Sequence, residues 1–308
     1  MFNPKVFKEL YIVSRPRQWT KNLIIYAAFL FTFKFEFSYF IFSTKAFICF
    51  CLISSTIYTL NDIFDRNSDR LHNTKKHRPI ASGKLPLKLA KIYFFFILIL
   101  SFSLSFSVSK LLFCSILSYF VIQLMYCLGL KRQPILDIFC IAIGFILRAV
   151  AGISFDGVLP SHWFLLSLGL LALFLAIEKR KAELRTTITT GVVTRQVLLR
   201  YSLPLLQRLE SLVACSAFMS YTLWSSGPSL NGASTSWMLL SIPFVLVGIF
   251  RYQLLSDPEE FQRRKKTFPN KNTENPEEIL LTDKGIQLSI IGWLVTVLLV
   301  GISSKFYS

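Results

Sequence analysis

Residues 46–69 read AFICFCLISSTIYTLNDIFDRNSD, an apolar run that passes directly into a segment rich in Asn and Asp. The apolar part ends at Leu60, and Asn61 and Asp62 follow it without a polar linker. Acidic side chains at the edge of such a run are costly in a membrane and usually serve a function. The stretch therefore predicts a membrane-spanning helix with a polar site at its end.

The composition of the whole chain also indicates a membrane protein. Its 308 residues are 53% hydrophobic and include 30 Phe against 17 Asp and Glu together, and the mean hydropathy is +0.52. These values exclude a disordered chain, a coiled coil and a disulfide-rich miniprotein. We therefore expect an all-α polytopic membrane protein that forms one transmembrane catalytic domain over residues 1–308.

The number of membrane spans follows from the apolar runs, since one spanning helix needs about 20 apolar residues. A window of that length finds about nine segments. They lie near 21–40, 44–62, 89–107, 110–128, 135–154, 162–178, 208–226, 235–254 and 286–304.

Positive charge is concentrated in alternate loops. Lys and Arg gather in the N-terminal segment and near 63–88, 179–207 and 255–285. The opposite loops hold only Lys34, Lys45, Lys110 and Lys305. Because basic loops stay in the cytoplasm, we expect the N-terminus and the long polar loops to be cytoplasmic. No nucleic-acid-binding motif accompanies the net charge of +17, so we interpret it as basic loops and anionic substrates rather than nucleic acid.

The polar segment after Leu60 has the spacing of a metal site. If the helix continues, each residue turns about 100°, which places Asn61, Asp65 and Asp69 on one face with Asp62 beside them. Carboxylates this close repel one another unless a cation lies between them. Oxygen ligands suit Mg²⁺, which commonly bridges carboxylates to a substrate phosphate. We therefore predict these four residues as Mg²⁺ ligands and the three aspartates as catalytic, with a solvated helix end as the alternative.

Basic residues follow the acidic segment, namely Arg70, His72, Lys75 and Arg78. Cations next to metal-binding carboxylates are typical of a diphosphate site, although a basic cytoplasmic loop has the same composition. Arg148 lies inside segment 135–154, where a charge costs at least about 2.5–3.5 kcal/mol. We expect Arg148 to face an internal anion, and a side chain that extends to the membrane surface is the alternative.

Several short sequence blocks, each occurring once, follow one another along the chain. They read RPRQWxKN at 15–22, NDxxDxxxD at 61–69, RPIxSG at 78–83, YCxGLK at 126–131, LRAVAG at 147–152 and KRxAEL at 179–184. The second and third resemble the first aspartate-rich motif of the UbiA superfamily of intramembrane prenyltransferases. The other blocks resemble the branch of decaprenyl-phosphate phosphoribosyltransferases.

The resemblance implies helices around a central polar cavity open to the cytoplasm, and transfer of 5-phosphoribose from phosphoribosyl diphosphate to a polyprenyl phosphate with Mg²⁺. It also implies a set of substrate-binding residues. These are Lys21, Arg70, His72, Lys75, Arg78, Tyr126, Lys131, Arg148, Lys179, Arg180 and Glu183. The expected location is a bacterial plasma membrane or a plastid or thylakoid-type membrane, with a role in cell wall or glycolipid precursors.

Two alternatives remain open on sequence. A prenyltransferase acting on an aromatic acceptor would carry a second Asp-rich motif after segment 162–178, but residues 178–183 read EKRKAE. A transporter would show inverted repeats or broken helices, and the sequence shows neither sign. Acceptor chain length and oligomeric state are left undetermined.

Overall fold

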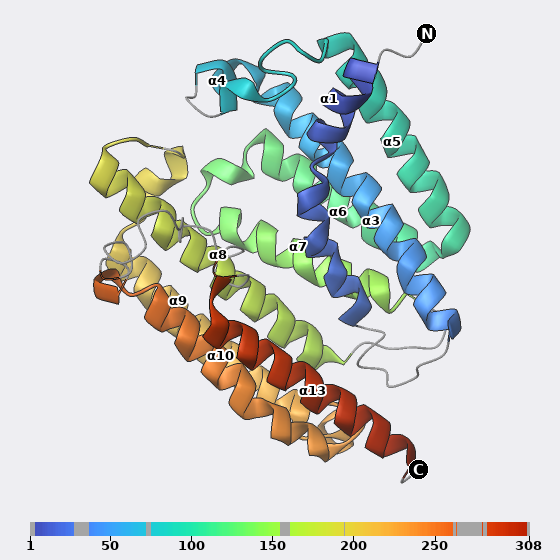
Figure 1. Cartoon of the computed structure of the whole chain (residues 1–308), viewed down its shortest axis with the longest axis vertical. Coiled ribbons are helices and arrows are strands. Elements are labelled where there is room, and N and C mark those ends of the chain that lie inside the picture. The colour runs from blue at the N-terminus through green and yellow to red at the C-terminus, as the bar shows by residue number, and fades with distance from the viewer. Residues whose placement is uncertain are drawn as a thin grey trace. The chain divides into compact units, whose positions relative to one another are not determined.

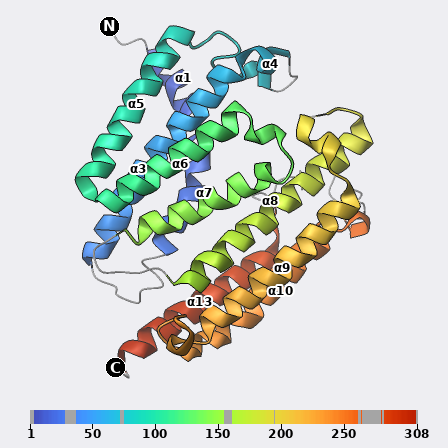
Figure 2. The ribbon, with the colours of Figure 1, turned by 180° about the vertical axis from the view of Figure 1, so that it is seen from behind.

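A computed structural model describes residues 4–27, 37–71, 75–154, 161–193, 195–260, 263, 279 and 282–306. Every regular element within these ranges is a helix, so the all-α prediction is confirmed there. The chain divides into two compact units (Figures 1 and 2). The first comprises Met1–Phe29, Lys34–Leu130 and Leu147–Leu159, and the second Leu30–Phe33, Lys131–Ile146 and Pro160–Ser308. The single catalytic domain stays a prediction.

The first unit is built on three long helices that pack on one another, α3, α5 and α6. In chain order its elements are α1 (Pro4–Ser14), η1 (Pro16–Ile24), α3 (Phe37–Phe64), α4 (Arg66–Leu71), η2 (Lys75–His77), α5 (Leu87–Val108) and α6 (Lys110–Leu128). Phe50, Ile53, Leu112 and Ile116 form much of the core. The link between α5 and α6 is short because Ser109 ends one helix and caps the next, its Oγ accepting a 3.3 Å bond from the Leu111 amide.

Helix α7 (Leu136–Gly152) follows η3 (Leu130–Arg132) and contributes residues to both units. The second unit continues with α8 (His162–Thr190), η4 (Gln196–Arg200), α9 (Leu203–Ser225), η5 (Pro228–Leu230), η6 (Ser236–Ser241), α10 (Ile242–Leu255) and α13 (Lys284–Phe306). Helix α8 packs along α9, and α10 packs along α13 (Figure 2). Phe174, Leu206, Tyr252 and Ile286 belong to the shared core.

Among the residues that the structure describes, six helices are long and apolar enough to cross a membrane, judged by length and composition. They are Phe37–Phe64, Leu87–Val108, Lys110–Leu128, His162–Thr190, Ser236–Leu255 and Lys284–Ser303. Their outer faces carry large exposed apolar side chains, such as Phe96 and Ile99 of α5, as lipid contact requires. Helices α7 and α9 lie where spans were predicted but are not among the six. The nine spans and the central polar cavity therefore stay predictions.

The first two predicted spans are divided incorrectly. We placed a break between residues 40 and 44, but α3 runs through it from Phe37 to Phe64. Phe42, Ser43 and Ala46 are buried on this part of α3, so packing continues across the expected break. Of the first span, residues 28–36 lie outside the described ranges.

Helix α8 is longer than predicted, and it ends at Thr190 instead of near residue 178. Two ion pairs at i,i+3 spacing support the added turns, between Lys181 and Glu178 and between Arg180 and Glu183. The helix ends where Gly191 adopts φ +70°, a left-handed conformation that glycine accepts without strain. Of the predicted basic loop, Lys179, Arg180, Lys181 and Arg185 therefore lie on this helix.

The acidic segment is not one straight helix. Helix α3 ends at Phe64 and α4 begins at Arg66, with a turn at Asp65. Helix-type bonds still cross the turn, because the Asp65 amide donates to the Asn61 carbonyl at 2.9 Å and the Asp69 amide to the Asp65 carbonyl at 2.8 Å. Asn61, Asp65 and Asp69 therefore still follow one another at helical spacing, but the turn at Asp65 interrupts the single helix that was predicted.

Candidate active site

Two arginines of the first unit lie against the acidic segment. Asp62 is 2% exposed and Asp69 is 3% exposed. Arg78 Nη1 lies 2.7 Å from Asp69 Oδ2 and 3.2 Å from Asp62 Oδ1, and Arg15 Nη2 lies 2.5 Å from the same Asp62 oxygen. An unpaired buried charge is strongly destabilising, so these contacts explain how two carboxylates are held inside the protein.

The N-terminal segment brings Arg15 to this position. Arg15 adopts φ 49° between α1 and η1, and its guanidinium lies 5.0 Å from the centre of the Tyr58 ring. Ser55 on α3 donates to the Ser14 carbonyl at 3.1 Å and accepts a 3.1 Å bond from Trp19 Nε1. Arg15 was not among the site residues predicted from sequence, although it begins the RPRQW block at residues 15–19.

The other predicted metal ligands lie beside this pair. Asn61 and Asp65 are half-buried, and Asn61 Oδ1 accepts a 3.7 Å contact from Cys127 Sγ. Within the described residues, no group of three or more His, Cys, Asp and Glu side chains is close enough to hold a metal ion. Mg²⁺ commonly uses only one or two carboxylates and completes its shell with water and substrate phosphate. The oxygen-bearing side chains of this segment therefore fit Mg²⁺ in kind, with the substrate supplying further ligands.

Arg148 on α7 is 5% exposed, which confirms that it faces the protein interior. Its Nε donates to Asn22 Oδ1 at 2.7 Å and its Nη2 to the Tyr119 hydroxyl at 2.9 Å. The guanidinium also lies 4.7 Å from the centre of the Tyr119 ring, a favourable cation–π contact. Its predicted role in binding an anion is not tested by these contacts.

Arg180 and Glu183 of the second unit lie in a buried polar network. Asp137 is fully buried and accepts a 2.6 Å bond from Arg180 Nε and a 2.7 Å bond from the Tyr201 hydroxyl. Arg180 Nη1 also lies 2.6 Å from Glu183 Oε2. The Tyr201 oxygen accepts a 2.6 Å bond from the Ile135 amide. The network ties the start of α7 to α8 and η4.

The protonation of Tyr201 suits its place in this network. Burial raises the pKa of Tyr201 above its ordinary value, and the Asp137 carboxylate beside it acts in the same direction. Tyr201 therefore keeps its proton and remains a donor to Asp137. Neither residue was selected from sequence, because a single Asp and a single Tyr far apart in the chain carry no local motif.

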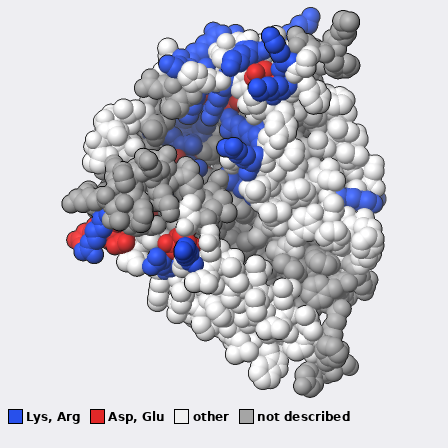
Figure 3. Space-filling view, in the orientation of Figure 1, with Lys and Arg blue, Asp and Glu red and all other residues white. Residues whose placement is uncertain are grey.

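The remaining predicted residues that the structure describes lie at the surface or are half-buried. Arg70 is exposed and donates to the Ala81 carbonyl at 3.0 Å, and His72 lies outside the described residues. The half-buried ones are Lys21, Lys75, Tyr126, Lys131 and Lys179. In Figure 3 the blue Lys and Arg side chains gather over the end of the first unit that carries α4 and the start of α5.

Known proteins resemble this chain over nearly its whole length. Decaprenyl-phosphate phosphoribosyltransferase from Mycolicibacterium smegmatis is 34% identical over 296 residues, which cover 92% of this chain and 89% of that protein. The protein of the same name from Mycobacterium tuberculosis is 33% identical over 289 residues, covering 92% and 91%.

Solved structures show the same fold. A UbiA homolog from Archaeoglobus fulgidus bound to DMAPP and Mg²⁺ aligns with a TM-score of 0.68 at 18% identity, covering 94% of this chain and 99% of that one. A digeranylgeranylglyceryl phosphate synthase aligns with a TM-score of 0.66 at 17% identity, covering 98% and 100%. The UbiA prenyltransferase family matches residues 22–273, and this chain is therefore a member of that family and an integral membrane protein.

Proposed function

We propose that this protein transfers 5-phosphoribose from 5-phosphoribosyl 1-diphosphate to a polyprenyl phosphate and releases diphosphate. The observation that carries the proposal is the similarity to proteins named decaprenyl-phosphate phosphoribosyltransferase, at 33–34% identity over 92% of the chain. The basic sequence of residues 178–183, where a second Asp-rich motif would support prenyl transfer, agrees with it.

The donor diphosphate belongs at the acidic segment in this proposal. The C1–O bond of the donor breaks with its electron pair leaving on diphosphate, and an oxygen of the acceptor phosphate bonds to C1. When bound by Asn61, Asp62, Asp65 and Asp69, Mg²⁺ would supply positive charge to the leaving group. The neighbouring cations Arg70, His72, Lys75 and Arg78 would add fixed positive charge that favours the same separation.

The buried ion pairs position this machinery. Arg78 bonds both Asp62 and Asp69, and Arg15 bonds Asp62, so these contacts orient two carboxylates before substrate binds. The acceptor phosphate is already ionised near neutral pH, and the reaction needs no strong general base. Correct alignment of donor and acceptor then accounts for much of the rate.

In this proposal, basic and polar residues outside the acidic segment bind the phosphate groups other than the donor's diphosphate. The candidates for phosphate binding are Lys21, Lys131, Arg148, Lys179 and Arg180, and Tyr126 and Glu183 are proposed as further substrate contacts. Arg180 is 1% exposed and bonded to Asp137 and Glu183, which favours a positioning role for it. Lys179, its half-buried neighbour on α8, is the stronger candidate for direct contact.

Prenyl transfer to an aromatic acceptor is the second candidate. It is favoured by the fold shared with a UbiA homolog bound to DMAPP and Mg²⁺, whereas the sequence of residues 178–183, which lacks a second Asp-rich motif, counts against it. In either case the proposed setting is a bacterial plasma membrane or a plastid-type membrane. The N-terminus and the basic loops face the cytoplasm, and the product of phosphoribosyl transfer is a precursor of cell wall or glycolipid.

The deciding experiment compares the two donors with the purified protein in detergent. Labelled phosphoribosyl diphosphate with Mg²⁺ and decaprenyl phosphate should give a labelled lipid, and chelation of Mg²⁺ should abolish it. Phosphoribosyl diphosphate with Mg²⁺ should also raise the unfolding temperature far more than geranylgeranyl diphosphate does. Stabilisation and turnover with the prenyl donor alone would reverse the assignment.

A further inference from the structure

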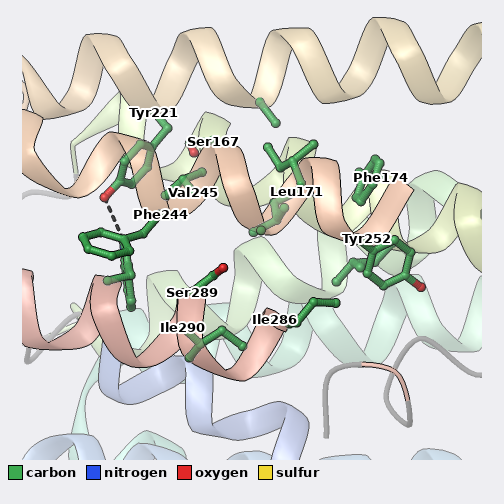
Figure 4. Close-up of a pocket in the computed structure, with 15 residues that line it drawn as sticks. Ser167, Leu171, Phe174, Tyr221, Phe244, Val245, Tyr252, Ile286, Ser289 and Ile290 are labelled. Carbon is green, nitrogen blue, oxygen red and sulfur yellow. Dashed lines mark hydrogen bonds between the residues drawn. The ribbon is translucent and has the colours of Figure 1, made fainter. Parts of the chain in front are cut away.

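The second unit contains an apolar cavity of about 330 Å³ between α8, α9, α10 and α13. Its volume lies within the range of about 300–1,000 Å³ typical of small-molecule sites. In Figure 4, Tyr221 and Phe244 lie at one end of the cavity, and Phe174 and Tyr252 lie at the other. Three of its four helices qualify as membrane spans. The cavity is therefore within reach of lipid hydrocarbon.

Three polar side chains of the lining, those of Tyr221, Ser289 and Trp293, are bonded within the protein. The Tyr221 hydroxyl is 2.6 Å from Ser241 Oγ and accepts a 2.7 Å bond from Trp293 Nε1. Ser289 Oγ donates to the Gly285 carbonyl of its own helix at 3.0 Å. Most of the other lining residues are apolar, so the cavity favours an apolar ligand, and a strongly polar one would lose hydration there that few protein groups could replace.

Helix α8 connects this apolar surface to a positive charge. Leu171 and Leu175 line the cavity, and Lys179 follows at the same four-residue interval. Residues four apart lie on one face of a helix, so Lys179 extends the cavity-lining stripe by one turn. The stripe therefore matches an amphipathic ligand with an apolar chain and an anionic head.

We propose that this cavity binds isoprene units of the acceptor's tail, with the acceptor phosphate held at the Lys179 end of α8. The inference rests on the proposed phosphoribosyl transfer and adds the location of one substrate. It commits to the polyprenyl phosphate, because that substrate combines an apolar chain with the negative charge that Lys179 attracts. The rest of the long tail extends into the bilayer.

Gly248 on α10 gives a direct test, since it lines the cavity. A Cβ at Gly248 would meet Ser289 Cβ at 3.9 Å, an ordinary contact, so this position accepts a Cβ, and the rest of the Leu side chain in Gly248→Leu would occupy cavity space. The matched control is Val247→Leu, because Val247 is the next residue, is 54% exposed and does not line the cavity. Activity is measured with decaprenyl phosphate and with the short acceptor geranyl phosphate.

We expect Gly248→Leu to raise KM for decaprenyl phosphate at least tenfold while KM for geranyl phosphate changes less than twofold. Val247→Leu should change neither KM by more than twofold. Equal effects of Gly248→Leu on both acceptors, or no effect on either, would overturn the inference. Absence of phosphoribosyl transfer by the unaltered protein with every acceptor would instead refute the proposed function, so the two failures are distinct.

A second measurement covers the case in which Gly248→Leu does not fold. Decaprenyl phosphate with a photoreactive diazirine in its tail is cross-linked to the unaltered protein, and the labelled peptides are identified by mass spectrometry. Labels on α10 and α13 residues of the cavity, reduced by excess unmodified decaprenyl phosphate, support the site. Labelling there by a diazirine-tailed phospholipid but not by the polyprenyl probe would overturn it.

Discussion

At the residue scale, the acidic segment separates into two kinds of side chain. Asp62 and Asp69 are buried and ion-paired with arginine, whereas Asn61 and Asp65 are half-buried. The first kind is held by its ion pairs with Arg15 and Arg78, and breaking these pairs would leave a buried carboxylate without its partner. The second kind is partly exposed, so a bound metal and substrate can reach it without first entering the protein interior. Substitution of Asp65 is therefore the most direct test of the proposed metal site.

Asp65→Asn keeps the size of the side chain and removes its negative charge. We expect phosphoribosyl transfer to fall by about two orders of magnitude or more, since a metal-bound carboxylate acts through its charge on the transition state. Turnover is measured across a Mg²⁺ titration, with the unfolding temperature recorded for each variant. Asp257→Asn is the matched control, because Asp257 is exposed and caps the Glu259 amide at 2.9 Å, a role Asn can fill. Unchanged turnover of Asp65→Asn in excess Mg²⁺ would exclude this carboxylate as a catalytic ligand.

At the element scale, the start of α7 is held in an uncommon conformation. Ile135 adopts φ +72°, which a β-branched residue rarely does, and its amide donates to Tyr201 at 2.6 Å. Tyr201 in turn donates to Asp137, which also accepts from Arg180. The network therefore fixes the segment between Lys131 and α7 at a conformational cost. A left-handed residue of this kind costs about 1–3 kcal/mol.

Ile135→Asn should relieve part of that cost, because Asn tolerates the left-handed region and keeps the amide donor. We expect the free energy of unfolding to rise by about 1 kcal/mol, seen as a higher unfolding temperature in detergent. Leu136→Asn is the control, since Leu136 is as exposed as Ile135, at 47%, but begins α7 without a positive φ. A loss of stability at position 135 equal to that at 136 would show that backbone strain is not stored there.

Elements with local signals were predicted well from sequence, and those that depend on tertiary contacts were not. Segments 89–107 and 110–128 correspond closely to α5 and α6, because Ser109 caps the second helix where the apolar pattern breaks. The extension of α8 to Thr190 was missed, because its polar residues are stabilised by ion pairs and by burial of Leu184. Likewise, the bond between Asp137 and Arg180 joins residues far apart in the chain, which a single sequence cannot reveal.

At the scale of the whole molecule, charge and apolar surface are divided between regions of the chain. Basic residues concentrate near α4 and the start of α5 (Figure 3), whereas α5 and α13 expose Phe96, Ile99 and Leu288 along their spans. A membrane protein with this division orients its basic end toward the cytoplasm. If phosphoribosyl diphosphate binds at the acidic segment as proposed, this orientation determines the compartment from which that soluble, charged donor would enter.

Single cysteines placed in a cysteine-free background test this orientation, because Cys114 and Cys215 are exposed and would otherwise react. Ser82→Cys and Thr189→Cys lie at exposed positions in the basic regions, and Ser229→Cys is exposed between α9 and α10. We expect a membrane-impermeant maleimide to label the first two only from the cytoplasmic side and the third only from the opposite side, as the distribution of Lys and Arg requires. Phosphoribosyl transfer by each variant serves as the check on folding. Labelling of Ser82→Cys and Ser229→Cys from the same side would refute the predicted topology, because between these positions the chain would then cross the membrane an even number of times.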